Sequence, residues 1–268
     1  MSLPEIFGYL CAFVIGISLG LVGGGGSILA VPVLAYLFSV NEKVATAYSL
    51  FIVGTSALVG GIRQHLKGYV NWRTAIVFGI PAIISVAVVR HFVVPALPDI
   101  LFTVNEFDVT RRMGMFGLFA SLMIPAGLSM IKERRNGTNT VAKIGYSYFL
   151  IVTEGLVVGA ITGLIGAGGG FLIIPALVLL MGVSMKVAVG TSLIIVAFKS
   201  LIGFFLGDVM TMEIDWEFLA LFTGLSLVGI FIGSYLSNFI NDTKLKRYFG
   251  YFIFIMAIFI FYIEFFVQ

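Results

Sequence analysis

Residues 20–53 read GLVGGGGSILAVPVLAYLFSVNEKVATAYSLFIV, and residues 163–196 read GLIGAGGGFLIIPALVLLMGVSMKVAVGTSLIIV. The two stretches align without a gap, and about half of their positions are identical, as in the internal repeats from which many transporters are built. In both stretches a glycine cluster is followed by a short apolar run that contains a proline. The sequence therefore predicts two halves of one architecture, each organised around its glycines.

The composition indicates a lipid environment. Hydrophobic residues make up 60% of the chain and charged residues 11%, and the mean hydropathy is +1.11. Soluble domains are roughly half apolar and about a quarter charged. We therefore expect an integral membrane protein that uses the whole chain as one membrane domain. Cys11 is the single cysteine, so we expect neither an internal disulfide nor a metal site.

The chain divides into apolar segments at residues 6–22, 28–38, 44–62, 75–94, 113–131, 144–165, 171–181, 187–206, 218–240 and 248–266. Eight of them are long enough to cross a membrane, but residues 28–38 and 171–181 fall below the roughly 17 residues that a span needs. We interpret these two as half-helices. The predicted fold is an all-α integral membrane protein with a first five-segment repeat at 1–131, a linker at 132–143 and a second repeat at 144–268.

Charge in the loops predicts that the two repeats are inverted. The linker KERRNGTNTVAK around Asn136 and the loop 63–73 are basic, so both are placed in the cytoplasm. The loop 208–217, which is the repeat partner of 63–73, carries four acids and no Lys or Arg, so it is placed outside together with the C-terminus. Equivalent loops on opposite sides imply inverted repeats. Arg111 and Arg112 do not fit this rule, because they begin a span on the external side.

The glycine clusters predict a binding site. A run of small residues cannot hold a helix against lipid, so the backbone is expected to open there as a broken helix or re-entrant hairpin in each half. If the two tips meet near mid-membrane, free amides and positive dipole ends converge and favour an anion. The alternative is that the glycines only permit close helix packing. The predicted substrate-binding residues of the tips are Gly23, Gly24, Gly25, Gly26, Ser27, Gly166, Gly168, Gly169 and Gly170.

The two motifs GLVGGGGSILAVPVL and GLIGAGGGFLIIPAL, each followed by a segment with Ser-Leu, resemble the duplicated signature of the TauE/SafE family of sulfite exporters. The resemblance covers nearly the whole chain. It implies export of sulfite or organosulfonates such as sulfoacetate across a bacterial-type inner membrane. On the Ser-Leu segments, Ser49, Thr191 and Ser192 are the predicted binding residues, although the first half has Ala47 and Tyr48 where the second has Gly190 and Thr191.

Ionisable residues inside apolar segments are costly and indicate function. Lys199 lies seven residues after Ser192 and therefore on the same helix face, and Arg63 lies on the corresponding stripe of the first half. Both are predicted to bind the substrate. Glu154 and His65 are candidates for carrying a coupled proton. The alternatives are a structural ion pair between Lys199 and Glu154, and an Arg63 side chain that snorkels to the interface.

The sequence thus predicts a secondary active, proton-coupled exporter of small sulfur-containing anions. It has no ATP-binding motif, and the absence of HExxH and GxSxG motifs argues against an enzyme. The expected partners are a small anion and the lipid bilayer, with no nucleic acid and no cofactor, and a homodimer stays open. An anion channel and an importer of another small anion are the alternative functions.

Overall fold

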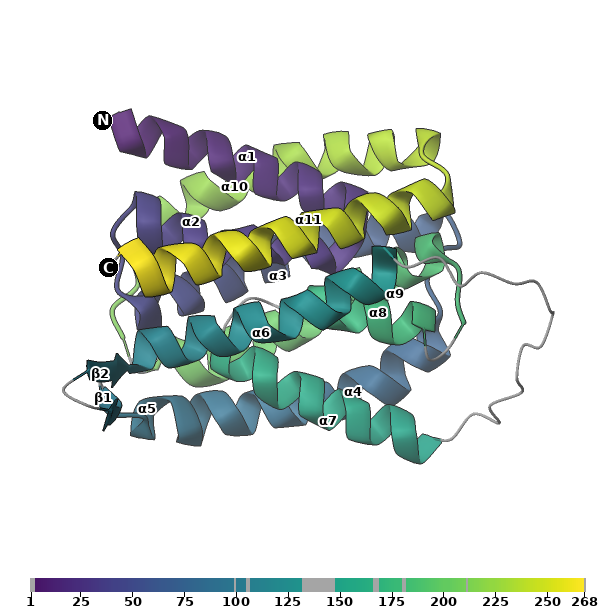
Figure 1. Ribbon diagram of the computed structural model, residues 1–268. Helices are drawn as coiled ribbons and strands as arrows, with labels where there is room; N and C mark the ends of the chain where they lie inside the picture. The colour runs from purple at the N-terminus through teal and green to yellow at the C-terminus, as the bar shows by residue number, and fades with distance from the viewer. Residues whose placement is uncertain are drawn as a thin grey trace.

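The computed structural model describes residues 3–98, 100–104, 107–131, 148–165, 169–179, 182–210 and 212–267. Long helices run roughly side by side along one direction, and both termini lie at the same end of the molecule (Figure 1). The first half contains α1 (Leu3–Val22), η1 (Gly23–Leu29), α2 (Ala30–Leu37), α3 (Glu42–Leu66), α4 (Trp72–Val88), η2 (Val89–Val93), α5 (Val94–Ala96), β1 (Ile100–Val104), β2 (Phe107–Thr110) and α6 (Arg111–Ile131). The second half contains α7 (Tyr148–Ile165), α8 (Gly170–Leu179), α9 (Met185–Gly203), η3 (Phe204–Asp208), α10 (Trp216–Leu236), η4 (Ser237–Phe239), α11 (Asp242–Tyr262) and η5 (Ile263–Val267). The linker around Asn136 and the terminal Gln268 lie outside the described residues.

Six helices in the described part of the chain are long and apolar enough to cross a membrane. They are the helices at Glu42–Leu66, Trp72–Ala96, Arg111–Ile131, Met185–Asp208, Trp216–Phe239 and Asp242–Phe266. The described apolar parts of α1 and α7 are shorter, at Ile6–Val22 and Ile151–Ile165, so for these two helices the expected crossing stays a prediction. Both helices lead into a glycine cluster. The all-α integral membrane fold is confirmed, with a small antiparallel sheet of β1 and β2 added between α5 and α6.

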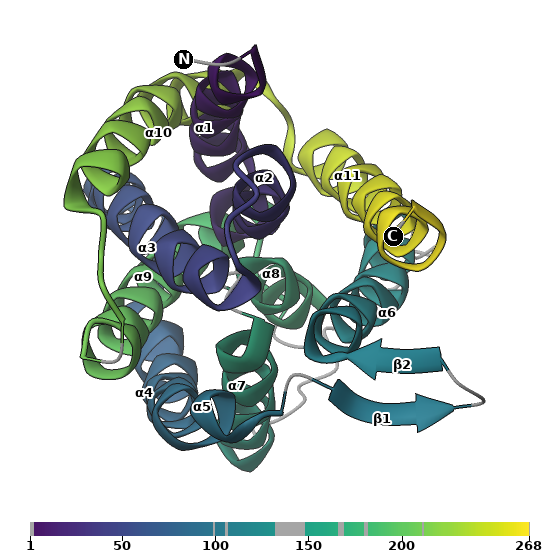
Figure 2. The ribbon, with the colours of Figure 1, turned by 90° about the vertical axis from the view of Figure 1, so that its left-hand side faces the viewer.

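The half-helices are short, as predicted: α2 has 8 residues and α8 has 10. α2 folds back against α1, so the two form a hairpin whose turn is η1, and η1 packs on α8 of the other half. In the view along the helices, α8 lies near the centre of the molecule with α2, α3, α7 and α9 around it (Figure 2). The two glycine segments therefore meet inside the bundle.

Helix contacts repeat between the halves. α1 packs on α10, and α7, the repeat partner of α1, packs on α4, the repeat partner of α10. α3 packs on its own partner α9, and α6 on its own partner α11. Such exchanged pairs are what a two-fold relation between the halves would produce.

Each first helix carries two glycines four residues apart, Gly16 and Gly20 on α1 and Gly159 and Gly163 on α7. This GxxxG spacing favours close helix packing. A side chain at Gly16 would place its Cβ 2.9 Å from the Cα of Gly229 on α10. At Gly159 the Cβ would lie 2.8 Å from the Cα of Ala82 on α4. In both halves the first helix therefore approaches its neighbour more closely than a side chain would allow.

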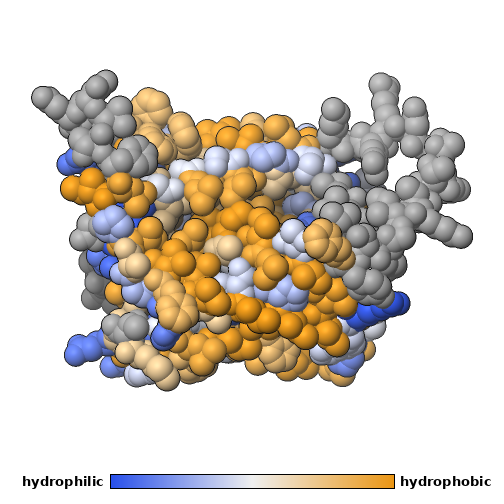
Figure 3. Space-filling view, turned by 90° about the horizontal axis from the view of Figure 1, so that it is seen from below, coloured by the Kyte–Doolittle hydropathy of each residue, from blue (hydrophilic) through white to orange (hydrophobic). Residues whose placement is uncertain are grey.

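The outer surface is apolar, as a protein surrounded by lipid requires. Figure 3 shows a broad hydrophobic area on the face that α4 and α7 share, with hydrophilic residues towards the two ends. Ile76, Ile80 and Ile84 form a stripe along α4 and are each more than half exposed. Their spacing of four residues keeps them on one side of the helix. This side of α4 faces away from the protein interior.

Candidate functional site at the two glycine tips

The two glycine tips touch through their backbones. A Cβ at Gly24 would lie 2.8 Å from the Cα of Gly170 and 2.7 Å from Val196 Cγ2, and a Cβ at Gly170 would overlap the backbone of Gly24. Glycine is therefore required at both positions because no side chain fits between the tips. The predicted meeting of the tips is confirmed for these residues, whereas Gly166 and Gly168 lie outside the described part of the chain.

The first glycine cluster is more regular than expected. Gly23, Gly24, Gly25 and Gly26 with Ser27 form the 3₁₀ helix η1, whereas we predicted an opened backbone. A 3₁₀ helix keeps hydrogen bonds between residues three apart, so fewer amides are left for a ligand. The positive φ of Gly23, 69°, lets the chain leave α1 and begin this tighter turn.

Ser192 on α9 holds the first tip. Its Oγ accepts a hydrogen bond from the amide of Gly24 at 3.3 Å and donates one to the carbonyl of Val189 at 2.9 Å. The equivalent Ser49 on α3 is also completely buried, and its Oγ donates to the carbonyl of Thr46 at 3.0 Å. The two predicted serines thus lie inside the bundle, and Ser192 directly contacts the glycines.

Lys199 lies at the second tip. Its ammonium group is buried, donates to Thr162 Oγ1 on α7 at 2.7 Å, and lies 2.8 Å from where a Cβ on Gly169 would be. The alternative of an ion pair with Glu154 is wrong: Glu154 precedes Thr162 by eight residues on α7, which corresponds to about 12 Å along a helix. Within the described residues, no carboxylate forms an ion pair with Lys199.

Two buried hydroxyls near the tips are left without partners. Ser27 on η1 and Ser200, which follows Lys199 on α9, are fully buried, and neither Oγ has a hydrogen-bond partner among the described residues. Buried hydroxyls are normally satisfied, so each is a donor that a bound anion could use. The interior therefore holds the Lys199 ammonium at the second tip and two unsatisfied hydroxyls, one on η1 and one next to Lys199 in the chain.

Thr191 is not at the tips. Its hydroxyl accepts a hydrogen bond from the amide of Asn71, the residue that caps α4, at 3.0 Å. The repeat partner Tyr48 does the same in the other half, because its hydroxyl accepts from the amide of Asp215, which caps α10, at 2.8 Å. Tyr48 and Thr191 differ in length, yet both hydroxyls make the same contact with the amide of a helix-capping residue.

Arg63 and His65 lie near the end of α3. Arg63 Nη1 donates to the carbonyl of Phe231 on α10 at 2.9 Å, and its guanidinium lies 5.4 Å from the centre of the Phe231 ring. His65 is exposed, and its Nδ1 accepts from Trp72 Nε1 at 3.1 Å. The structure thus brings Ser27, Ser192 and Lys199 to the tips but leaves Arg63 and His65 at one end of the bundle.

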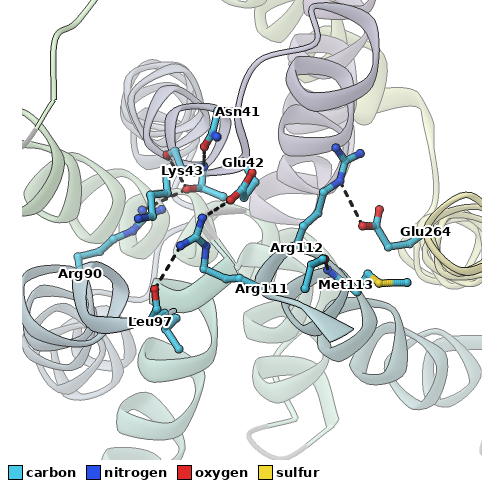
Figure 4. A network of polar contacts seen from close by, with 11 residues as sticks. Asn41, Glu42, Lys43, Arg90, Leu97, Arg111, Arg112, Met113 and Glu264 are labelled. Atoms are coloured by element: carbon cyan, nitrogen blue, oxygen red, sulfur yellow. Dashed lines mark hydrogen bonds and ion pairs between the residues drawn. The ribbon is translucent and has the colours of Figure 1, made fainter. Parts of the chain in front are cut away.

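Sequence reasoning missed three ion pairs at the opposite end, where the termini lie. Arg90 is fully buried and bridges Asp208 at 3.2 Å, Arg111 pairs with Glu42, and Arg112 lies 3.2 Å from Glu264. Figure 4 shows Arg111 turned towards Glu42 and Arg112 towards Glu264. These pairs explain why two arginines begin α6 on the side predicted to be external, since each faces a carboxylate. Arg90 lies inside the apolar segment 75–94, and an arginine there was the available signal for the first pair.

Comparisons with known proteins identify the family. Residues 8–260 match the family described as "Sulfite exporter TauE/SafE". The chain belongs to the TauE/SafE family. A "Probable membrane transporter protein" of Xylella fastidiosa (strain 9a5c) is 31% identical over 251 residues, which cover 92% of this chain and 90% of the relative. "Probable membrane transporter protein YunE" of Bacillus subtilis (strain 168) is 31% identical over 72% of this chain and 77% of its own length. No solved structure matches the chain. The protein is thus a multi-pass membrane transporter of this family.

Proposed function

We propose that this TauE/SafE protein exports small sulfur-containing oxyanions, such as sulfite or sulfoacetate, through the site at the two glycine tips. The observation that carries the proposal is the buried ammonium of Lys199 beside Gly169, with Thr162 as its partner and no carboxylate paired with it in the described structure. A buried charge without a counter-ion is costly, so an anionic substrate is the natural group to complete the site. The family description is consistent with this substrate class.

The tips supply the remaining interactions. α8 begins at Gly170, so the first amides of this helix point towards the meeting point and carry the positive end of its dipole. Ser27 and Ser200 add hydroxyl donors for the anion oxygens. Because the site lies away from water, each of these interactions is stronger than it would be at the surface. The arrangement suits an anion with several oxygen acceptors.

A proton gradient is the proposed energy source, and Glu154 is the proposed proton carrier. Glu154 is half-buried on α7, the helix that also supplies Thr162, and it forms no ion pair among the residues that the structure describes. His65 is less suited, because it lies exposed against Trp72. The proposal includes an inner-membrane location with the linker around Asn136 in the cytoplasm, and the basic residues of the linker and of the loop 63–73 support this orientation.

The test is transport by purified protein in liposomes with a panel of sulfite, sulfoacetate, taurine, sulfate and thiosulfate, with and without a proton gradient. We expect saturable counterflow of sulfite or sulfoacetate that increases with the gradient, and weaker counterflow with a Glu154→Gln variant. Ser121→Ala is a suitable control, because Ser121 is exposed on α6 and bonds only its own helix. Unitary current steps would instead indicate a channel. Counterflow of no anion in the panel would refute the proposal.

A further inference from the structure

Three cations gather at the end of the bundle where α3 finishes, which we call the basic end. Lys67 Nζ donates to the carbonyl of Ser234 at 3.3 Å and to Asn238 Oδ1 at 3.0 Å, and Arg63 bonds the Phe231 carbonyl. Partial burial lowers the pKa of Lys67, and the nearby charges of Arg63 and Lys186 lower it further. The hydrogen-bond acceptors of Arg63 and Lys67 are neutral groups. The basic end thus carries positive charge that no carboxylate of the described residues neutralises.

A small cavity of about 10 Å³, which is space for roughly one water molecule, adjoins these cations. Its lining includes Lys186 and Asn238, which accepts from Lys67, together with Leu21 and Val189. A Cβ at Gly23 would lie 2.9 Å from the Cα of Val189, so Val189 also adjoins the first glycine tip. One helical turn beyond Val189, Ser192 accepts from the amide of Gly24. The cations, the cavity and the tip therefore follow one another along the start of α9.

At the opposite end there is more space, and Arg90, Arg111 and Arg112 are each paired with a carboxylate. A cleft of about 510 Å³ opens there beside Tyr36, Asn41, Glu42 and Arg112. Its Arg112 faces Glu264, which also accepts from the Tyr36 hydroxyl at 3.0 Å, while Glu42 is paired with Arg111 (Figure 4). Paired charges attract a distant anion weakly, because their fields largely cancel. The two ends therefore differ in their attraction for anions.

We propose that Arg63, Lys67 and Lys186 form a recruitment site for the transported oxyanion at the basic end, from which the anion reaches the first glycine tip along α9. This inference rests on the proposed function, and it adds that the protein collects its substrate from the membrane side on which the basic end lies. Basic groups at the mouth of a cleft raise the local concentration of an anion and its association rate. The competing explanation is that these lysines only orient the protein in the membrane.

The test compares Lys67→Gln/Lys186→Gln with Lys43→Gln, which removes a lysine from the opposite end of α3. Initial rates of sulfite transport are measured in inside-out vesicles at low and at physiological salt. For the double variant we expect a KM about tenfold higher at low salt, an unchanged maximal rate and a weaker dependence on salt. Lys43→Gln and the conservative Lys67→Arg/Lys186→Arg variant should behave like the unmodified protein.

The outcomes separate the recruitment site from the proposed function. If the unmodified protein carries sulfite and the double variant keeps its KM and its salt dependence, the recruitment site is refuted while the exporter stands. If labelling of a Glu213→Cys reporter shows that the double variant is inserted the other way round, the lysines orient the chain and the inference fails. If the unmodified protein carries no anion, the proposed function and the recruitment site fall together.

Discussion

Replacing Lys199 with Met tests the core of the site. Met has a similar length and keeps the packing of this buried position, but it removes the positive charge beside Gly169. The change should not leave Thr162 unsatisfied, because the Thr162 hydroxyl also donates to the carbonyl of Gly159 at 3.3 Å. We therefore expect folded protein with an altered site.

The size of the effect follows from the geometry. An anion oxygen near Gly169 would lie within about 4 Å of the Lys199 ammonium, and at an effective dielectric constant of about 20 the attraction is about 4 kcal/mol. Part of this is offset by taking both charges out of water, so a net loss of about 3 kcal/mol is expected, which is about a hundredfold in Kd. Lys199→Arg keeps the charge on a bulkier group and should keep part of the affinity.

The assay is binding of sulfite and sulfoacetate to purified protein by calorimetry, together with size-exclusion profiles that report folding. Ile195→Val is the matched control for folding, because Ile195 is a buried residue of α9 that has no part in the proposed site. A Lys199→Met protein that is folded and binds both anions with unchanged affinity would refute the reasoning. In that case the anion would be held by other groups of the interior, with Ser49 and Ser192 as the first to examine.

Three further predictions concern the scaffold. Gly24→Leu should abolish transport while the protein remains in the membrane, because the new side chain would displace the second tip. The control Gly224→Leu should transport normally, because no atom lies within 4 Å of the added Cβ. Equal transport by the two variants would contradict the contact of the tips. Arg90→Met should lower the free energy of unfolding in detergent by about 3 to 5 kcal/mol, because it removes the arginine that pairs with the buried Asp208. The double variant Arg90→Met/Asp208→Asn should recover much of this loss. A single variant as stable as the unmodified protein would contradict the role of the pair. A Glu213→Cys reporter in a protein without the native cysteine should be labelled from outside the cell, and protection from external reagent would contradict the proposed orientation.

The glycine clusters made much of the fold predictable. A run of small residues followed by an apolar segment too short to span predicts a half-helix, because length and backbone hydrogen bonding in lipid leave few alternatives. Residues 6–22 and 144–165 were predicted as spans, and their described apolar parts, Ile6–Val22 and Ile151–Ile165, are close to the length of a crossing. The chain reversal at η1 shows that α1 forms a hairpin with α2. Apolar length alone does not decide whether such an arm crosses the membrane.

Side-chain partners were less predictable than backbone shape. The position of Lys199 at the tip followed from its spacing of seven from Ser192, because that spacing fixes a helix face. Its partner Thr162 comes from another helix, α7, and no local pattern indicates which helices will adjoin. The same reason explains why the pair of Arg90 with Asp208 was missed, since 118 residues separate the two along the chain. Contacts between halves depend on the assembled bundle.

The two halves share a backbone plan but divide the charge unequally. Tyr48 and Thr191 each accept from the amide of a helix-capping residue in the other half, so this contact is kept in both copies. Lys199 has no such counterpart, because the equivalent Ser56 bonds Ser226 Oγ at 3.0 Å inside the bundle. Under the proposed function, an anion at the meeting point is therefore held mainly by the second tip, while the first supplies shape and the contact through Gly24. A repeat that had kept a lysine in both halves would place two ammonium groups near the tips, and their repulsion would have to be offset whenever the site is empty. With a single lysine, the empty site holds one buried charge and no such repulsion.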